Sequence, residues 1–166
     1  NSNIIIPNAN VSAYAYKLIV LSKSFGPSRY LITALNLYNN NSYIPALYAA
    51  AYAYVFDNNT IVNQSYETKY VESNINNIFY GVWPSQFADE AQFYINEANL
   101  TNNQTEKSIF ISNAFYSMKL AVMLSNINQY IVKNSIIKNE TTMQQNIYTD
   151  ISSIYAILLI LTIIVI

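Results

Sequence analysis

The sequence predicts an all-α fold of antiparallel helical hairpins that ends in a long apolar helix. Three observations support this prediction. Apolar residues recur at helical spacing, and no sustained strand-like alternation is visible. The 166 residues include only two Gly and four Pro, so few positions interrupt a helix. Finally, the Asn-rich stretches between periodic segments are short, and short connections join antiparallel neighbours.

Three helices are predicted in the first third of the chain, at about 11–24, 28–39 and 43–56. The sequence Phe25-Gly26-Pro27 ends the first, and Pro45 is tolerated in the first turn of the third. Alanines within the third helix would allow close packing. The faces expected to be buried carry Tyr14, Leu18 and Leu21 in the first helix, and Leu31, Ala34, Leu35 and Tyr38 in the second.

Four more helices are predicted at about 66–80, 86–99, 106–134 and from 142 onward. A break at 81–84 separates the first two of these. We expect Ser85 and Thr105 to act as N-caps and Thr141 to open a capping box. The expected buried positions are Tyr66, Tyr70, Ile75 and Ile78 in the fourth helix, and Ile109, Tyr116, Leu120, Met123, Ile127 and Ile131 in the sixth.

The run 151–166 is continuously apolar, and Thr162 is the one polar residue among its last 12. As a helix it would be about 24 Å long, shorter than a hydrocarbon core of about 30 Å. No Lys or Arg follows it. It is therefore either part of a membrane helix, with Tyr155 at the interface, or a buried core helix. We favour a helical ectodomain at 1–140 and a membrane anchor at 141–166.

The composition excludes several classes of function. The chain has no Cys and no His, which removes disulfide frameworks, Cys zinc sites, thiol catalysis and Ser–His–Asp chemistry. Two Gly do not make a phosphate-binding loop. Eight Lys+Arg and a net charge of −1 argue against nucleic-acid binding. We expect no cofactor and no metal site.

Candidate catalytic groups are few. Asp89, Glu90 and Glu97 could be imagined as an acidic cluster, but a solvated helix N-terminus explains the adjacent pair better. Ser117 and Lys119 should lie on different helix faces, so a Ser–Lys dyad is not expected. The chain is therefore predicted not to be an enzyme. A sugar-stacking face was considered for Tyr14, Tyr16, Tyr48, Tyr52, Tyr54 and Trp83, although aromatic packing is the simpler interpretation.

N-glycosylation sequons are the most frequent motif. They begin at Asn10, Asn40, Asn58, Asn63, Asn99, Asn103 and Asn139. Chance alone gives roughly four in a chain so rich in Asn, Ser and Thr, so either composition or an extracellular, glycosylated surface accounts for them. A Cys-free, weakly charged chain of this kind resembles archaeal surface proteins. Because no side chain titrates between about pH 5 and 9, such a surface suits an acidic exterior.

Helices 28–39 and 43–56 resemble a tetratricopeptide hairpin, with Tyr43, Ala46 and Ala53 at the expected spacing. Ala114 and Ala121 repeat that spacing 68 residues after Ala46, which is twice the 34-residue period. The intervening unit has Tyr80 and Phe87 where small residues belong.

The Tyr/Ala-rich segment 42–50, together with the sequons and the apolar end, also resembles the C-terminal region of archaeal secreted Lon-like serine proteases. That resemblance implies an accessory helical region followed by a membrane anchor, and no catalytic residue is carried over. We expect a non-enzymatic extracellular interaction or accessory domain of an archaeal cell-surface protein, anchored at its C-terminus, with a protein or envelope partner. A membrane-anchored stalk supporting a surface layer is the alternative, for which Leu120, Met123 or Leu124, Ile127 and Tyr130 would form a seam.

Overall fold

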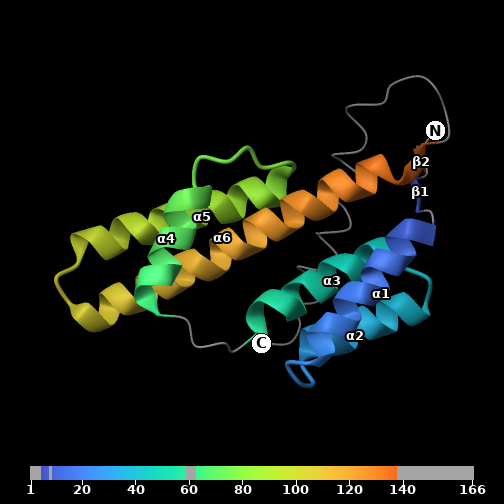
Figure 1. The fold of residues 1–166 in the computed structure, drawn as a ribbon, viewed down its shortest axis with the longest axis horizontal. Helices are drawn as coiled ribbons and strands as arrows, with labels where there is room; N and C mark the ends of the chain where they lie inside the picture. Colours follow the sequence, from blue (N-terminus) through green and yellow to red (C-terminus); the bar gives the residue numbers. More distant parts are fainter. Residues whose placement is uncertain (1–4, 8, 59–62, 138–166) are drawn as a thin grey trace.

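The computed structural model describes residues 5–7, 9–58 and 63–137, and within them the fold is all-helical apart from one two-stranded ribbon (Figure 1). The elements in chain order are β1 (Ile5–Pro7), α1 (Ala9–Lys23), α2 (Arg29–Asn39), α3 (Tyr43–Phe56), α4 (Gln64–Asn74), α5 (Val82–Leu100), α6 (Gln104–Lys133) and β2 (Ser135–Ile137).

The first three helices pack together as one group. The Ser28 hydroxyl caps α2 by accepting from the Leu31 amide at 3.1 Å. Helix α3 has nine buried residues among its 14, and its alanines let α1 and α2 approach closely. Ser22 of α1 is fully buried and donates to the carbonyls of Leu18 and, at 3.2 Å, Ala50. The buried hydroxyl therefore links α1 directly to the α3 backbone.

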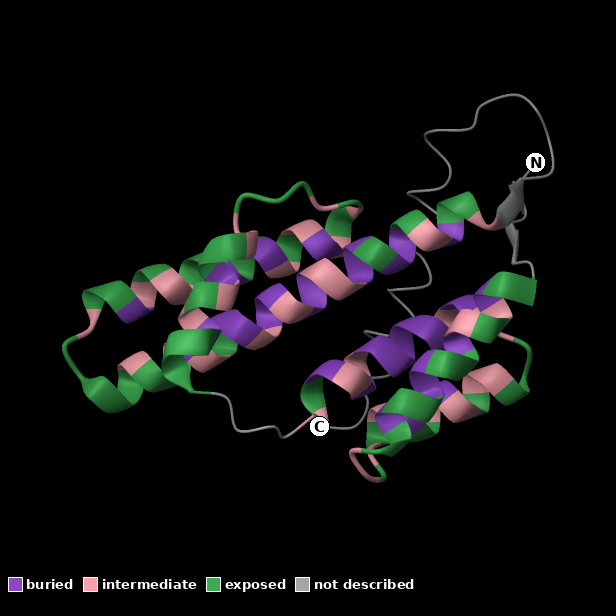
Figure 2. Ribbon diagram, viewed as in Figure 1, coloured by how far each residue is buried: buried purple, intermediate pink, exposed green. Residues whose placement is uncertain are grey.

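The second group contains α4, α5 and α6, of which α5 and α6 form the longest hairpin. Helix α6 has 30 residues, or about 45 Å at 1.5 Å per residue. Its first half packs against α4 and α5 through Ala114 and Met118, and its second half packs against α3 through Leu124 and Ile127. Figure 2 shows the buried residues along the inner faces of both groups. Helix α6 therefore belongs to both cores.

A polar network also joins the two groups. The Tyr48 hydroxyl of α3 donates to Asn128 Oδ1 on α6, and Asn128 Nδ2 donates to the Tyr80 carbonyl. Ser125 Oγ accepts from the Tyr80 amide at 2.9 Å. Gly81 follows with φ +110°, and a Cβ there would lie 2.4 Å from Asn128 Nδ2. The network thus ties the segment before α5 to both α6 and α3.

The β ribbon brings distant parts of the chain together. Strand β1 pairs antiparallel with β2, with Ile5 opposite Ile137 and Pro7 opposite Ser135. Next to it, Asn10 Nδ2 donates to Asn134 Oδ1 at 3.3 Å and the Tyr130 hydroxyl donates to the Asn10 carbonyl at 3.1 Å. Residues 5 and 137 therefore lie side by side at the C-terminal end of α6, away from the α5–α6 turn (Figure 1).

Several predicted boundaries are confirmed and others are wrong. Helix α3 has the predicted bounds, and α1 and α2 agree within two residues. The helix predicted at 66–80 ends at Asn74, where Asn74 Nδ2 donates to the Tyr70 carbonyl and Asn74 Oδ1 accepts from Asn77 Nδ2. Such local side-chain bonds compete with the helix.

The predicted break at 81–84 is also wrong, because α5 begins at Val82. Gly81 precedes it, and Pro84 is accommodated in its first turn. Ser85 is not the N-cap: it lies inside the helix and donates to the Gly81 carbonyl at 3.0 Å. Asn103 caps α6 in place of Thr105, since its Oδ1 accepts from the Thr105 and Glu106 amides.

The predicted buried faces are partly correct. Leu18, Leu31, Ala34, Leu120, Ile127 and Ile131 are buried. Leu21, Tyr66, Ile78 and Ile109 are exposed, so helical spacing alone assigned them to the wrong side.

The predicted hairpins are present as α2–α3 and α5–α6, while a tetratricopeptide-like stack is not established: α3 packs against α6, as α4 does. One helix of the described part, α6, is long and apolar enough to cross a membrane, and half of its most apolar window is buried within the fold. The predicted anchor 141–166, the helix starting near Thr142, Tyr155 and the boundary at 140 lie outside the described residues.

Candidate functional site

The six aromatic residues considered for sugar stacking do not form one face. Tyr48 is buried and bonded to Asn128. The Tyr14 ring packs on Tyr130 at 4.7 Å, while Tyr16 meets Tyr38 at 5.8 Å on another side of α1. Burial, and then the neighbouring Tyr130, raise the pKa of the Tyr14 phenol. These residues serve helix–helix packing at separate places.

Tyr52, one of these six residues, belongs to a stack of rings between α2, α3 and α6. Tyr30 stacks on Tyr52 at 5.6 Å and on Phe56 at 6.0 Å, and Phe56 stacks in turn on Tyr116 at 6.1 Å. Phe87 of α5 meets the edge of Tyr52 at 6.2 Å. Burial is the main cause that raises the pKa of Tyr52, followed by the charges of Tyr30 and Glu90. The stack fills the junction between the two helical groups.

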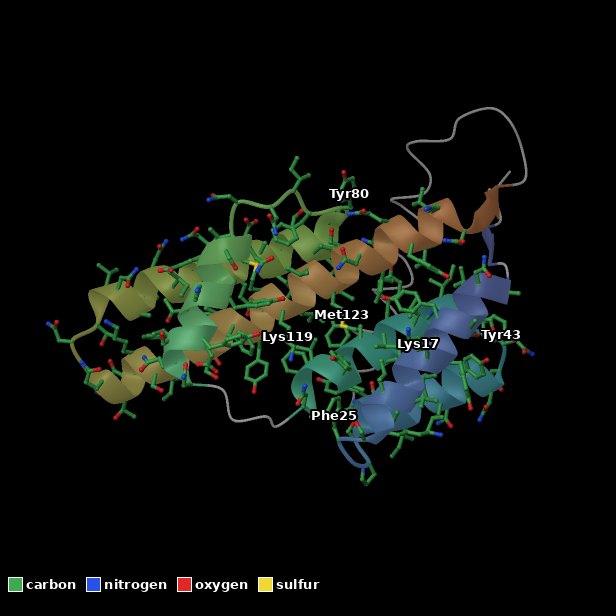
Figure 3. All side chains as sticks on the ribbon, in the orientation of Figure 1. Lys17, Phe25, Tyr43, Tyr80, Lys119 and Met123 are labelled. Carbon is green, nitrogen blue, oxygen red and sulfur yellow. The ribbon has the colours of Figure 1, made fainter. Side chains whose placement is uncertain are left out.

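Ser117 and Lys119 do not act on each other. The Ser117 hydroxyl donates to Glu90 Oε2 at 3.1 Å. Lys119 lies between α6 and α3 (Figure 3), with Nζ 5.7 Å from the Tyr54 ring centre and 5.6 Å from that of Phe115. Burial lowers the pKa of Lys119, and the rings stabilise its cationic form. Lys119 is therefore a cation packed against two aromatic rings, whereas the Ser117 hydroxyl donates to a carboxylate.

The two adjacent acidic residues of α5 point in different directions. Asp89 is exposed on the outer side, whereas Glu90 bonds to α6. In the described part of the chain, no group of three or more His, Cys, Asp or Glu residues is placed to hold a metal ion.

Five of the sequon asparagines are exposed and a sixth, Asn58, is half-buried; the exposed ones are Asn10, Asn40, Asn63, Asn99 and Asn103. Asn63 and Asn103 cap helices through Oδ1, which leaves Nδ2, the atom that carries a glycan, outside the cap. Asn99 and Asn103 flank the α5–α6 turn. Asn139 lies outside the described residues.

One exposed face of α1 and α2 is apolar and basic; we call it the basic face. Its apolar residues are Tyr16, Val20 and Ile32, all about half-exposed. The hydrogen bond between Ser12 Oγ and the Tyr38 hydroxyl and the Tyr16–Tyr38 ring contact set the pairing of α1 with α2, which brings Ile32 level with Val20. Its charged residues are Lys17, Lys23 and Arg29, all exposed.

The outer side of α5 is apolar and acidic; we call it the acidic stripe. Val82, Phe93 and Leu100 are exposed on it, Leu100 by 77%. Helical periodicity places Asp89 and Glu97 on the same side, opposite the buried Ala88 and Ala91. Neither surface was among the sites expected from the sequence, although the charges are already segregated along the chain.

Comparison with known proteins finds no matching family model, no matching curated sequence and no matching solved structure.

Proposed function

We propose that this chain is a non-enzymatic helical interaction domain on the extracellular face of an archaeal cell, tethered to the membrane through its C-terminal segment. Its partner would be another protein or an envelope component. The observation that carries the proposal is the position of residue 137, which the ribbon holds beside residue 5 at one end of α6.

This geometry defines two ends of the fold. We call the end that holds residues 5 and 137 the base, and the α5–α6 turn the tip. A tether that follows residue 137 would leave from the base. The α5–α6 turn would stand up to about 45 Å away, the length of α6. Asn99 and Asn103 are exposed beside that turn, which is where glycans would meet the least steric hindrance. The arrangement suits a domain held at a membrane and glycosylated at its far end.

Within this proposal, the α2–α3 and α5–α6 hairpins are tetratricopeptide-like units. The small residues seven apart support this: Ala46 and Ala53 in α3, and Ala114 and Ala121 in α6, are fully buried. Small buried residues at this spacing allow the close helix contacts that such units need. The outer faces of the hairpins would then meet the partner.

Two alternatives keep the membrane tether but give the domain a different role. As the accessory region of a membrane-bound Lon-like serine protease, the domain would have the same base and tip. The stalk alternative needs α6 to offer its apolar seam to another chain, but Leu120, Leu124 and Ile127 pack with α3 inside the fold. That packing favours the interaction domain over a stalk built on this seam.

Cysteine labelling tests the orientation, because the chain has no Cys of its own. Asn102→Cys at the α5–α6 turn should react with a membrane-impermeant maleimide on intact cells of the native host. Ser22→Cys, at a fully buried position, is the matched control and should react only after unfolding, and the unmodified chain reports the background. Labelling of Asn102→Cys only after cell lysis would refute the exterior assignment.

A further inference from the structure

The charges of this chain are segregated between the two surfaces defined above. Residues 9–56 contain Lys17, Lys23 and Arg29 and no Asp or Glu, whereas α5 contains three carboxylates and no Lys or Arg. The carboxylate of Asp57, at the end of α3, accepts a hydrogen bond from the Ser28 hydroxyl near one edge of the basic face. The basic face therefore carries net positive charge and the acidic stripe net negative charge.

Both surfaces also carry exposed apolar residues. The basic face carries Tyr16, Val20 and Ile32, and the acidic stripe carries Val82, Phe93 and Leu100. Apolar residues rimmed by polar ones are typical of protein-binding sites. Here the rims have opposite signs, which gives the two surfaces complementary potentials.

The two surfaces lie on different sides of the fold. In Figure 1, α5 lies on one side of α6, and α1 and α2 lie on the other. The acidic stripe points away from α6, since Ala88 and Ala91 of α5 face inward. Lys17 of the basic face is labelled on α1 in Figure 3. One molecule thus cannot bring its own two surfaces together, but two molecules can.

We propose that the basic face of one copy binds the acidic stripe of a second copy, so that the chain assembles head to tail. Different surfaces meet in such a contact, so each copy keeps one free surface of each kind, and addition continues until a ring closes or a filament grows. A net charge of −1 leaves little overall repulsion against association. The inference rests on the proposed function in one respect, because it names a second copy as the partner of the interaction domain.

Charge reversal tests this contact in the full 166-residue chain, kept in a mild nonionic detergent. The basic-face variant is Lys17→Glu with Lys23→Glu, and the acidic-stripe variant is Asp89→Lys with Glu97→Lys. Lys17, Lys23 and Asp89 are exposed and Glu97 is half-buried on the outer side of α5, so the fold should tolerate the changes. Lys69→Glu with Lys133→Glu is the matched control, because both residues are exposed and lie outside the two surfaces.

Sedimentation velocity should show concentration-dependent assembly of the unmodified chain that weakens as NaCl rises from about 0.05 to 0.5 M. Each reversed variant alone should need at least tenfold higher concentration to assemble, while the control should behave as the unmodified chain. A chain with all four reversals should assemble again, because both surfaces have then exchanged sign. That rescue is specific to a contact between the two surfaces.

Three results would overturn the proposal. One is an unmodified chain that stays monomeric at high concentration and low salt. Another is assembly that persists in both variants, which would indicate a contact through some other surface. The third is a monomer whose Lys17 and Lys23 are needed to bind phosphatidylglycerol vesicles, which would assign the basic face to a membrane. Because the maleimide experiment reads location and sedimentation reads self-association, either proposal can fail while the other stands.

Discussion

Replacing Asn128 by Ala should strongly destabilise the fold, because this side chain connects three elements. Its Oδ1 accepts the Tyr48 hydroxyl of α3, and its Nδ2 donates to the Tyr80 carbonyl before α5. Tyr48 is 1% exposed and Asn128 6%, so water has little access to the groups left behind. The substitution therefore removes two hydrogen bonds, one to the buried Tyr48 hydroxyl and one to the partly buried Tyr80 carbonyl.

The magnitude follows from those two groups. Losing a hydrogen bond to a buried polar group costs about 1–3 kcal/mol, so removing both bonds in Asn128→Ala should lower the free energy of unfolding by about 2–4 kcal/mol. Tyr48→Phe leaves only Asn128 Oδ1 without its donor and should cost about 1–2 kcal/mol. Because the two side chains share one hydrogen bond, the double variant should cost at least about 1 kcal/mol less than the sum of the single variants.

Urea unfolding followed by circular dichroism at 222 nm measures these values. Asn113→Ala is the control: it makes the same change on the exposed side of α6, where we expect an effect within about 0.5 kcal/mol. The reasoning would be refuted if Asn128→Ala cost no more than Asn113→Ala, or if the Tyr48 and Asn128 effects were additive.

Three further predictions concern other parts of the fold. Gly81→Ala should lower the melting temperature well below that of Gly26→Ala, because both glycines have positive φ but only Gly81 has a side chain in the way of a Cβ; equal effects would contradict this. Burial lowers the pKa of Lys119, so its charge opposes folding and the unmodified chain should gain stability relative to Lys119→Met as pH rises through that lowered pKa. Urea unfolding at pH 7 and pH 9.5 tests this, and a gap between the two proteins that does not change with pH would contradict it. Glycan occupancy in protein from the native host should be higher at Asn103 than at Asn10, whose Nδ2 is engaged near the ribbon; glycopeptide mass spectrometry measures the ratio, and the opposite order would count against the exposed-tip argument.

Local sequence signals predicted the helices whose ends are set by neighbouring residues. Helix α3 starts after a polar turn, admits Pro45 in its first turn and ends at an Asp-led turn, all of which can be read along the chain. Helix α2 begins after Ser28, whose hydroxyl caps it. In these cases the decisive interactions lie within a few residues, so the boundaries could be predicted.

The start of α5 shows where such reasoning fails. Gly81-Val82-Trp83-Pro84 reads as a break, because Gly and Pro commonly interrupt helices. In the structure, Asn128 and Ser125 of α6 hold Tyr80 in place, and the helix begins one residue after Gly81. The partners are more than 40 residues away in the sequence, so no local pattern could have indicated them.

The two candidate surfaces divide in the same way. The charge segregation that distinguishes them is written in the sequence, since each charged residue can be located there. The sequence does not show which apolar residues are exposed on these two surfaces, because helical spacing is compatible with more than one buried side. Leu21 and Ile109, for example, were both expected in the core and are exposed.

The helical class, the lack of Cys and His, the sequons and the separation of charges can all be read along the chain, because each depends on residue type or on short-range spacing. The buried side of each helix, the way α6 joins two cores and the position of residue 5 beside residue 137 are visible only in the folded chain. Those features depend on contacts between residues far apart in the chain. Such contacts form only when the chain folds as a whole, burying its apolar faces and pairing its buried polar groups at the same time.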